Sequence, residues 1–241
     1  MKVMYFIHAL DVAGAEKICT QYLLELKRRK IDVILIVIAH RNNFLEDELK
    51  RNGIRVVSIH PFMPTNIFFS IINSCYSRLI SLDKWWDKII DEEKPDLIHI
   101  HTYDFRYFRA KKYPASKLIY TFHGHVKRYM NIMGIEGRNL IRRYANEGMK
   151  FFALSSDITR EIRAALKTEN IVYIPNGVQI ENIKNGAYTR DSFLASINIP
   201  TDSFIMGHIA RFNKEKNQER TIKIFKEVLS QNKAWCMGIR Y

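Results

Sequence analysis

Residues 3–26, VMYFIHALDVAGAEKICTQYLLEL, decide the fold. The run at residues 3–7 is continuously apolar and rich in strand-forming side chains, which is typical of a strand buried on both faces of a sheet. A loop with Asp11 and Gly14 follows, and apolar side chains then recur at helical spacing over residues 15–26. A strand, a loop and an amphipathic helix in this order predict the first unit of a parallel α/β sheet.

The same unit recurs along the chain. A helix is expected over residues 44–51, ended by Gly53, and six further apolar runs predict strands at 33–38, 54–59, 97–101, 118–122, 151–155 and 171–174. Alternating strands and helices require parallel pairing with right-handed crossovers. The sequence therefore predicts an α/β fold with a Rossmann-like parallel sheet of seven strands up to about residue 178.

An insert at residues 61–93 interrupts this alternation, and we expect two helices in it. It is rich in apolar and aromatic side chains, namely Phe68, Phe69, Ile71, Ile72, Tyr76, Leu79, Trp85, Trp86 and Ile89. One interpretation is that these side chains cover the sheet. The other is that they form a surface for a membrane or a lipid acceptor. The sequence leaves both interpretations open.

A domain boundary is expected after the turn at residues 175–177, where a polar linker begins. The chain then divides into a first domain, residues 1–178, and a second segment, residues 179–241, with the linker and the start of another Rossmann-like domain. In this segment we expect a strand at 204–209, a helix over 218–230 and a further strand from 234. One strand and one helix cannot bury both their faces, so exposed side chains are expected at Ile222, Phe225 and Leu229.

Composition limits the function classes. The formal net charge of +13 predicts attraction to an anionic ligand, an anionic membrane surface or nucleic acid. Helix-turn-helix, RNA-recognition and zinc-finger patterns are missing from the sequence, so a nucleic-acid partner is not expected. Cys19, Cys75 and Cys236 form no CxxC pair, which favours a cytoplasmic protein. The sequence has no run of about 18 apolar residues without a charge, so no transmembrane helix is expected.

Three histidines follow or end predicted strands. His123 comes directly after residues 118–122, which places an imidazole at the carboxyl edge of the sheet, where open α/β folds bind ligands. His99 and His101 end a neighbouring strand and are expected to share the site. Carboxylates and cysteines do not recur at ligand spacing, so a hydrogen-bonding role is favoured over a metal site.

Gly14, Arg211 and Lys216 are candidates for binding phosphate groups. Gly14 lies between the first strand and helix, where backbone N–H groups can receive phosphate oxygens, although a tight turn explains a glycine there equally well. Arg211 follows the strand at 204–209, and Lys216 precedes the next helix. Two cations beside a helix N-terminus suit a diphosphate, whereas the alternative is ordinary surface charge.

Five segments occur in an order that resembles glycosyltransferase family 4. They are AGAE at 13–16, PDLIHIH at 95–101, TFHG at 121–124, IPNGV at 174–178 and GHIARFNKEKN at 207–217. The resemblance implies the GT-B architecture, in which an acceptor-side and a donor-binding Rossmann-like domain face each other across a cleft. Most members of the family transfer a sugar from a nucleotide donor with retention of configuration.

The resemblance also implies roles for individual residues. His123 would contact the donor sugar near the reacting centre, as the catalytic residue, and Gly14, Arg211 and Lys216 would bind the donor diphosphate. His101 is assigned to the acceptor side or the cleft. No metal and no cofactor are expected, because the nucleotide-sugar is a substrate and fixed cations can stabilise the leaving diphosphate.

The function that follows is hexosyl transfer from a nucleotide-sugar donor to a glycan or lipid-linked acceptor in surface polysaccharide biosynthesis, with the protein peripheral on the inner face of the membrane. The sequence departs from the family at Ala13, where a glycine is usual, and it lacks the paired-glutamate motif within its 241 residues. We therefore expect a truncated chain with little activity. The alternative is a non-catalytic module that binds an acceptor or a partner glycosyltransferase.

Overall fold

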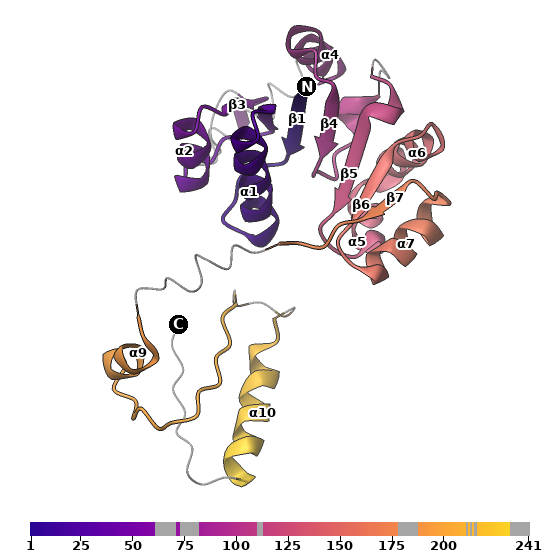
Figure 1. Ribbon diagram of the computed structural model, residues 1–241. Coiled ribbons are helices and arrows are strands. Elements are labelled where there is room, and N and C mark those ends of the chain that lie inside the picture. The colour runs from indigo at the N-terminus through magenta and orange to yellow at the C-terminus, as the bar shows by residue number, and fades with distance from the viewer. Residues whose placement is uncertain are drawn as a thin grey trace. The chain divides into compact units, whose positions relative to one another are not determined.

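The computed structural model describes residues 1–60, 71–72, 82–109, 113–177, 188–210, 212, 214 and 216–231. The chain divides into two compact units, Met1–Gly177 and Val178–Tyr241. Figure 1 shows the helices and strands of each unit.

The first unit contains a seven-stranded sheet whose paired strands are all parallel, in the order β3-β2-β1-β4-β5-β6-β7. The strands are β1 Lys2–Ile7, β2 Asp32–Val37, β3 Arg55–Ser58, β4 Leu97–Ile100, β5 Leu118–Phe122, β6 Lys150–Ala153 and β7 Ile171–Tyr173. The predicted Rossmann-like sheet is confirmed. Its order reverses direction between β1 and β4, and this switch point is where open parallel sheets bind ligands.

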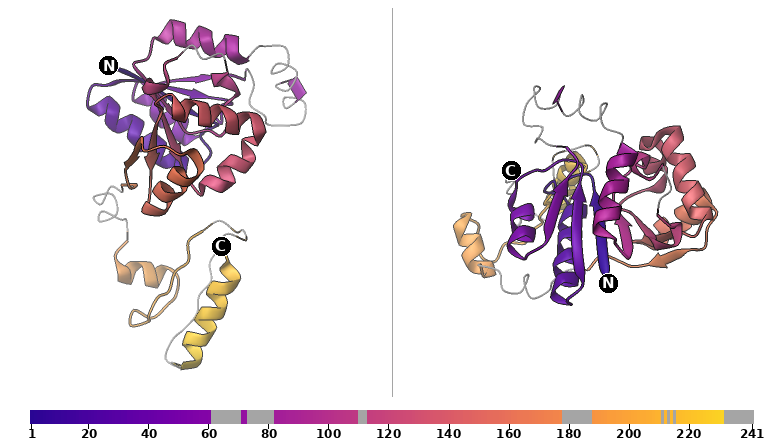
Figure 2. Two further views of the ribbon diagram at one scale, coloured as in Figure 1. Left: turned by 90° about the vertical axis from the view of Figure 1, so that its right-hand side faces the viewer. Right: turned by 90° about the horizontal axis from the view of Figure 1, so that it is seen from above.

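Helices lie on both sides of this sheet (Figure 2). They are α1 Gly14–Arg28, α2 Phe44–Arg51, α4 Leu82–Glu93, α5 Val126–Ile132, α6 Gly134–Asn146 and α7 Ser156–Leu166, with short 3-10 turns η1 Arg106–Phe108 and η2 Ala115–Lys117. Strand β1 supplies two hydrophobic clusters because its side chains alternate. Val3, Tyr5 and Ile7 pack with residues of α1 and α2, whereas Met4 and Phe6 join the cluster that includes α4 to α7.

The insert covers the sheet in the part that the structure describes. Trp86 of α4 is 2% exposed, and its ring centroid lies 5.0 Å from that of Phe6 and 4.9 Å from that of Phe108. Ile89 is buried in the same cluster. Ile71 is exposed, and Phe68, Phe69, Tyr76 and Leu79 lie outside the described residues. The covering interpretation is therefore correct for α4.

The second unit differs from the expectation at residues 204–209. These residues form no strand, and Ile209 is fully exposed. A strand needs a pairing partner, and the described residues of this unit contain none. The expected strand was therefore wrong, while residues from 234 lie outside the described chain.

Two helices make up the regular structure described in the second unit, α9 Arg190–Ser196 and α10 Gln218–Gln231. Ile222 is exposed as expected and Leu229 is partly exposed, but Phe225 is 7% exposed. Leu194 of α9 is also buried. The expectation for Phe225 was wrong, because the unit has a small interior that helical periodicity alone does not reveal.

We predict that Trp86→Ala lowers the free energy of unfolding by about 3–5 kcal/mol, because the substitution leaves a cavity between α4 and the sheet. The neighbouring Trp85 is a matched control. It is only partly buried, so Trp85→Ala should cost roughly 1 kcal/mol. Urea denaturation of both variants measures the two losses, and equal losses would contradict the packing described for α4.

Candidate functional site

The switch point brings the ends of three strands together. Because β1 lies beside β4 and β4 beside β5, the residues that follow these strands meet at one edge of the sheet. His8 follows β1, His101 follows β4 and His123 follows β5. The parallel direction of the strands thus gathers histidines from three distant parts of the sequence.

Two of these histidines form a hydrogen bond. The Nδ1 atom of His101 lies 2.7 Å from the Nε2 atom of His123, and the two rings are stacked with centroids 5.0 Å apart. His101 is 6% exposed and His123 is partly exposed. The pair therefore extends from the protein interior to the surface at the carboxyl edge.

The buried end of the pair continues into the sheet. His99 and His101 share a face because strand side chains alternate, and their ring centroids are 4.1 Å apart. His99 Nε2 lies 2.7 Å from the hydroxyl oxygen of Thr121, and the ring of Tyr5 stacks on that of His101 at 5.3 Å. Tyr5 and Thr121 were not among the residues expected from the sequence, although Tyr5 lies two residues and Thr121 one residue before the end of its strand, and these positions are a signal for them.

The imidazoles of His99, His101 and His123 are neutral at pH 7. Burial lowers the pKa of His99 to about 3 and that of His123 to about 4. The pKa of His101 lies well below its ordinary value, first because of burial and then because of the adjacent His99 and His123. The cluster therefore offers neutral hydrogen-bonding groups and not cations.

Aromatic side chains lie beside His123. The Tyr103 ring stacks with His8 and meets Tyr129 edge-on, each with centroids 6.1 Å apart. The Tyr129 hydroxyl accepts a hydrogen bond from the backbone N–H of His123, and burial raises the pKa of that hydroxyl. Tyr129 also lies 3.7 Å from the point that a Cβ on Gly124 would occupy. These tyrosines hold the loop after β5, and no sequence pattern indicated them.

Gly14 is the first residue of α1, at the same carboxyl edge of the sheet. Its φ angle is not positive, and a Cβ built on it would meet no atom within 4 Å. A tight turn therefore does not require glycine at this position. The space above the backbone is open, as close approach of a ligand to the first N–H groups of a helix requires.

The loop that precedes Gly14 is held from the next loop of the sheet. The Asn43 side-chain amide donates to the carbonyl oxygen of Leu10 at 2.5 Å, and Arg41 Nε donates to the Asp11 carboxylate at 2.5 Å. Asn43 also caps α2, accepting hydrogen bonds from the backbone N–H groups of Leu45 and Glu46. Two hydrogen bonds thus connect the loop between β1 and α1 to the loop between β2 and α2.

The cationic candidates lie in the second unit. Lys216 is exposed, two residues before α10, and Arg211 lies outside the described residues. Of the candidates from the sequence, the structure therefore brings His101 and His123 into contact and places Gly14 at the same sheet edge.

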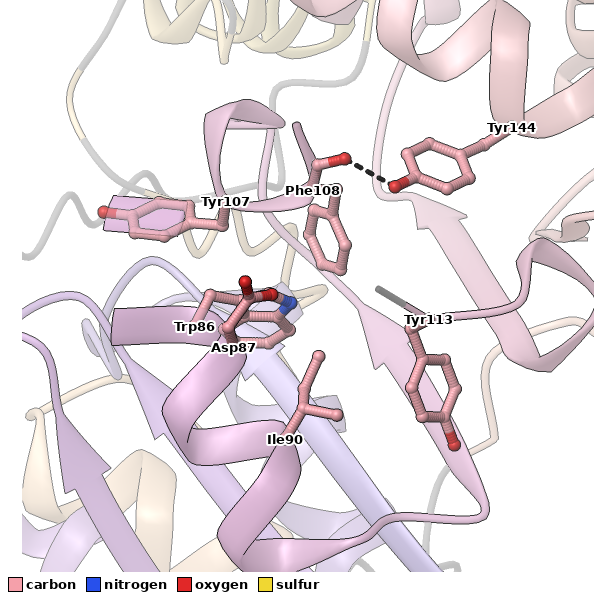
Figure 3. Close-up of a pocket in the computed structure, with 7 residues that line it drawn as sticks. All are labelled: Trp86, Asp87, Ile90, Tyr107, Phe108, Tyr113 and Tyr144. Atoms are coloured by element: carbon pink, nitrogen blue, oxygen red, sulfur yellow. Dashed lines mark hydrogen bonds between the residues drawn. The ribbon is translucent and has the colours of Figure 1, made fainter. Parts of the chain in front are cut away.

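One small cavity lies away from this edge, and Figure 3 shows the residues that line it. Its volume is about 10 Å³, bordered by Trp86 and Ile90 of α4 and by Phe108. The Tyr144 hydroxyl closes one side by donating to the carbonyl oxygen of Phe108 at 2.5 Å. A volume of this size holds at most about one water molecule, so it cannot accept a sugar or a nucleotide.

The structure contains no group of three or more metal-ligating side chains in the part of the chain that it describes. Among those same residues, none of the helices has the length and apolar character needed to cross a membrane.

The fold and the sheet edge define the class of this protein. It is an α/β protein with a Rossmann-like sheet of the type found in GT-B glycosyltransferases, as comparison with solved structures shows. The model of Glycosyltransferase Family 4 matches residues 12–182. The chain belongs to glycosyltransferase family 4, and the expected resemblance is confirmed. A search of curated proteins found no match.

Three solved structures illustrate the shared fold. Anabaena Alr3699/HepE in complex with UDP and glucose superposes with a TM-score of 0.66 at 18% identity, over 96% of this chain and 59% of that one. A glycosyltransferase from Rickettsia africae ESF-5 superposes with a TM-score of 0.65 at 18% identity, over 94% of this chain and 57% of that one. WaaG, a glycosyltransferase involved in lipopolysaccharide biosynthesis, superposes with a TM-score of 0.63 at 11% identity, over 95% of this chain and 61% of that one. The chain thus spans about three-fifths of the length of these proteins.

We predict that the protein loses stability between pH 6.5 and about pH 4. Histidines in the unfolded chain take up protons below about pH 6.5, whereas the lowered pKa values of His99, His101 and His123 keep these groups neutral in the folded chain. Folding is therefore penalised as the pH falls, by about 1.4 kcal/mol per pH unit for each group.

Urea denaturation at a series of pH values measures this slope. His99→Gln should flatten it, because the amide can still reach the Thr121 hydroxyl but does not titrate. His125→Gln is the control, since His125 is exposed and its pKa is raised by the hydrogen bond to Glu161. A slope that His99→Gln leaves unchanged would contradict the buried neutral cluster.

Proposed function

We propose that this chain serves in the transfer of a hexose from a nucleotide-sugar donor to a glycan or lipid-linked acceptor during surface polysaccharide biosynthesis. The observation that carries the proposal is the hydrogen-bonded pair of His101 and His123 at the switch point of a family 4 sheet. A neutral pair at a ligand-binding edge suits hydroxyl-rich ligands, because it can form a hydrogen bond to a hydroxyl group without a charge.

Each candidate residue has a role in this proposal. His123 contacts the donor sugar near the reacting carbon. His101, which is hydrogen-bonded to His123, is assigned to the acceptor side or the cleft. Gly14 leaves room for the donor phosphates, while Arg211 and Lys216 neutralise the diphosphate as it leaves. Fixed cations stabilise the charge that develops on a leaving group, so the proposed chemistry needs neither a metal nor a cofactor.

The donor class is supported by the solved structures. HepE is described in complex with UDP and glucose, and WaaG takes part in lipopolysaccharide biosynthesis. We propose the same class of donor, a nucleotide-sugar, for this chain. The expectation that the 241-residue chain has little transfer activity stays a prediction.

The alternative is a binding module that holds an acceptor or a partner glycosyltransferase through its first unit. Such a module needs no affinity for a nucleotide. Donor binding therefore distinguishes the two proposals before any transfer is measured.

We predict that the protein binds UDP, as a nucleoside diphosphate probe, and that the double substitution of Arg211 and Lys216 by Ala weakens binding at least about tenfold. A charge-assisted hydrogen bond contributes about 1.5–3 kcal/mol, so the loss of two exceeds one factor of ten. Lys214→Ala is the matched control, because Lys214 is an exposed cation of the same segment. Calorimetric titration measures the affinities.

Binding that is indifferent to the double substitution would contradict the diphosphate site. No binding of UDP, of other nucleoside diphosphates or of nucleotide-sugars would favour the module. Incubation with radiolabelled nucleotide-sugars and a lipid-linked acceptor then tests transfer separately.

We also propose that the protein associates with the inner face of the membrane through a surface of α5 and α6. Ile132 and Ile135 are 50% and 72% exposed there. Lys127, Arg128 and Arg142 are exposed cations of the same two helices. Exposed isoleucines together with cations suit the interface of an anionic membrane.

We predict that the protein binds vesicles that contain anionic phospholipid more tightly than neutral vesicles, and that Ile132→Ser with Ile135→Ser weakens this binding. Each cation near an anionic surface contributes about 1 kcal/mol, so binding should also fall with salt. Ile222→Ser with Ile224→Ser in α10 removes two other exposed isoleucines and is the control. Equal binding to both kinds of vesicle, in a sedimentation assay, would contradict the proposal.

A further inference from the structure

The hydrogen bond between His101 and His123 restricts where their protons lie. The two nitrogen atoms are 2.7 Å apart, a distance at which one must carry a hydrogen and the other a lone pair. Both imidazoles are neutral at pH 7, so each ring has one N–H and one bare nitrogen. Only two arrangements of the protons satisfy these conditions.

In the first arrangement, His101 Nδ1–H donates to His123 Nε2. The bare nitrogen of His101 is then Nε2, and the hydrogen of His123 lies on Nδ1. In the second arrangement, His123 Nε2–H donates to His101 Nδ1. The hydrogen of His101 then lies on its own Nε2, and Nδ1 of His123 is bare.

The surroundings of His101 Nε2 decide between the two arrangements. This atom is buried and has no hydrogen-bond partner among the residues that the structure describes. The ring is enclosed by Tyr5, stacked at 5.3 Å, and by His99 at 4.1 Å between centroids. Among backbone groups, a buried N–H without an acceptor is rarer than a buried carbonyl oxygen with an unused lone pair, and we apply the same preference to the imidazole. The first arrangement is therefore favoured, since it leaves no N–H without a partner.

We infer that His101 is a positioning residue that fixes His123 as the Nδ1–H tautomer, so that His123 presents a hydrogen-bond donor to an oxygen atom of the ligand. The lone pair of His123 Nε2 is already occupied by His101. His123 is consequently neither a proton acceptor nor a metal ligand in this state. The backbone hydrogen bond to Tyr129 supports the arrangement by holding the loop of His123 in place.

The tautomer follows from the unliganded structure, whereas the class of ligand rests on the proposed function. A sugar hydroxyl and a phosphate oxygen both accept a hydrogen bond from such an N–H group. The two sources share one chemistry, and the nucleotide probes below separate them.

The test is nuclear magnetic resonance of the full chain labelled with ¹⁵N in histidine. One-bond couplings between nitrogen and hydrogen report directly which ring nitrogen is protonated. We expect the hydrogen on His123 Nδ1 and on His101 Nδ1 in the unliganded protein. A hydrogen found on His123 Nε2 would overturn the inference, and this measurement requires no variant.

Two variants then test positioning. His101→Asn retains an N–H donor near the position of Nδ1, so His123 should keep its Nδ1–H tautomer. His101→Leu has a similar volume but no donor, and the His123 hydrogen should move to Nε2 or divide between both nitrogens. An unchanged tautomer in the Leu variant would overturn the inference. If that variant does not fold, a shifted tautomer in the Asn variant would overturn it instead.

Titration with UDP and with UDP-glucose adds the ligand. His101→Leu should weaken UDP-glucose about tenfold, as expected for one hydrogen bond, while His101→Asn should bind it like the unaltered protein. A loss confined to UDP-glucose identifies a sugar hydroxyl as the acceptor, and a loss with both probes identifies a phosphate oxygen. Absence of all binding would refute the proposed function but not the tautomer, whereas intact binding with a wrong tautomer would refute only this inference.

Discussion

The rest of the structure depends on the parallel pairing of β1 with both β2 and β4. Strand β1 pairs with β2 from Lys2 to Ile7 and with β4 from Val3 to Phe6, so its backbone hydrogen bonds are satisfied on both edges. Its alternating side chains supply both hydrophobic clusters of the first unit. A strand satisfied on both edges and buried on both faces must be apolar throughout, and this requirement explains why residues 3–7 carry so clear a signal.

The same pairing creates the sheet edge at which the candidate site lies. Because the sheet reverses its order at β1, the loop that leads to α1 and the loops after β4 and β5 gather at one place. The cost is that three histidines lie close together in a region of low polarity. Burial keeps all three neutral, which removes their mutual repulsion and makes the cluster a source of hydrogen bonds. In the proposed function, the charge that neutralises a diphosphate is therefore assigned to lysine and arginine and not to these histidines.

Fold and family contribute different information about this protein. The solved structures share 11–18% identity with the chain and establish the arrangement of the sheet. An α/β sheet of this kind supports many reactions, so it does not specify one. The family match over residues 12–182 assigns the chain to glycosyltransferase family 4, and the proposal of glycosyl transfer rests on this match. The histidine pair connects the two, because it lies where the fold binds ligands and where the family motif TFHG places His123.

Much of the first unit could be predicted from the sequence, since apolar runs, helical periodicity and the residues that end each strand are local signals. Seven strands, the position of Gly14 and the sheet-edge location of His101 and His123 follow from them. The 2.7 Å contact of the two histidines depended on β4 lying beside β5, which no local pattern specifies. Contacts between distant segments also explain the second unit. Residues 204–209 have the composition of a strand but form none, because they have no pairing partner among the described residues. Phe225 is buried by residues outside its own helix, which helical periodicity does not predict. Local chemistry decided which segments could form elements and which side chains reached the edge, whereas contacts between distant segments decided the pairing, the burial and thereby the protonation of the site.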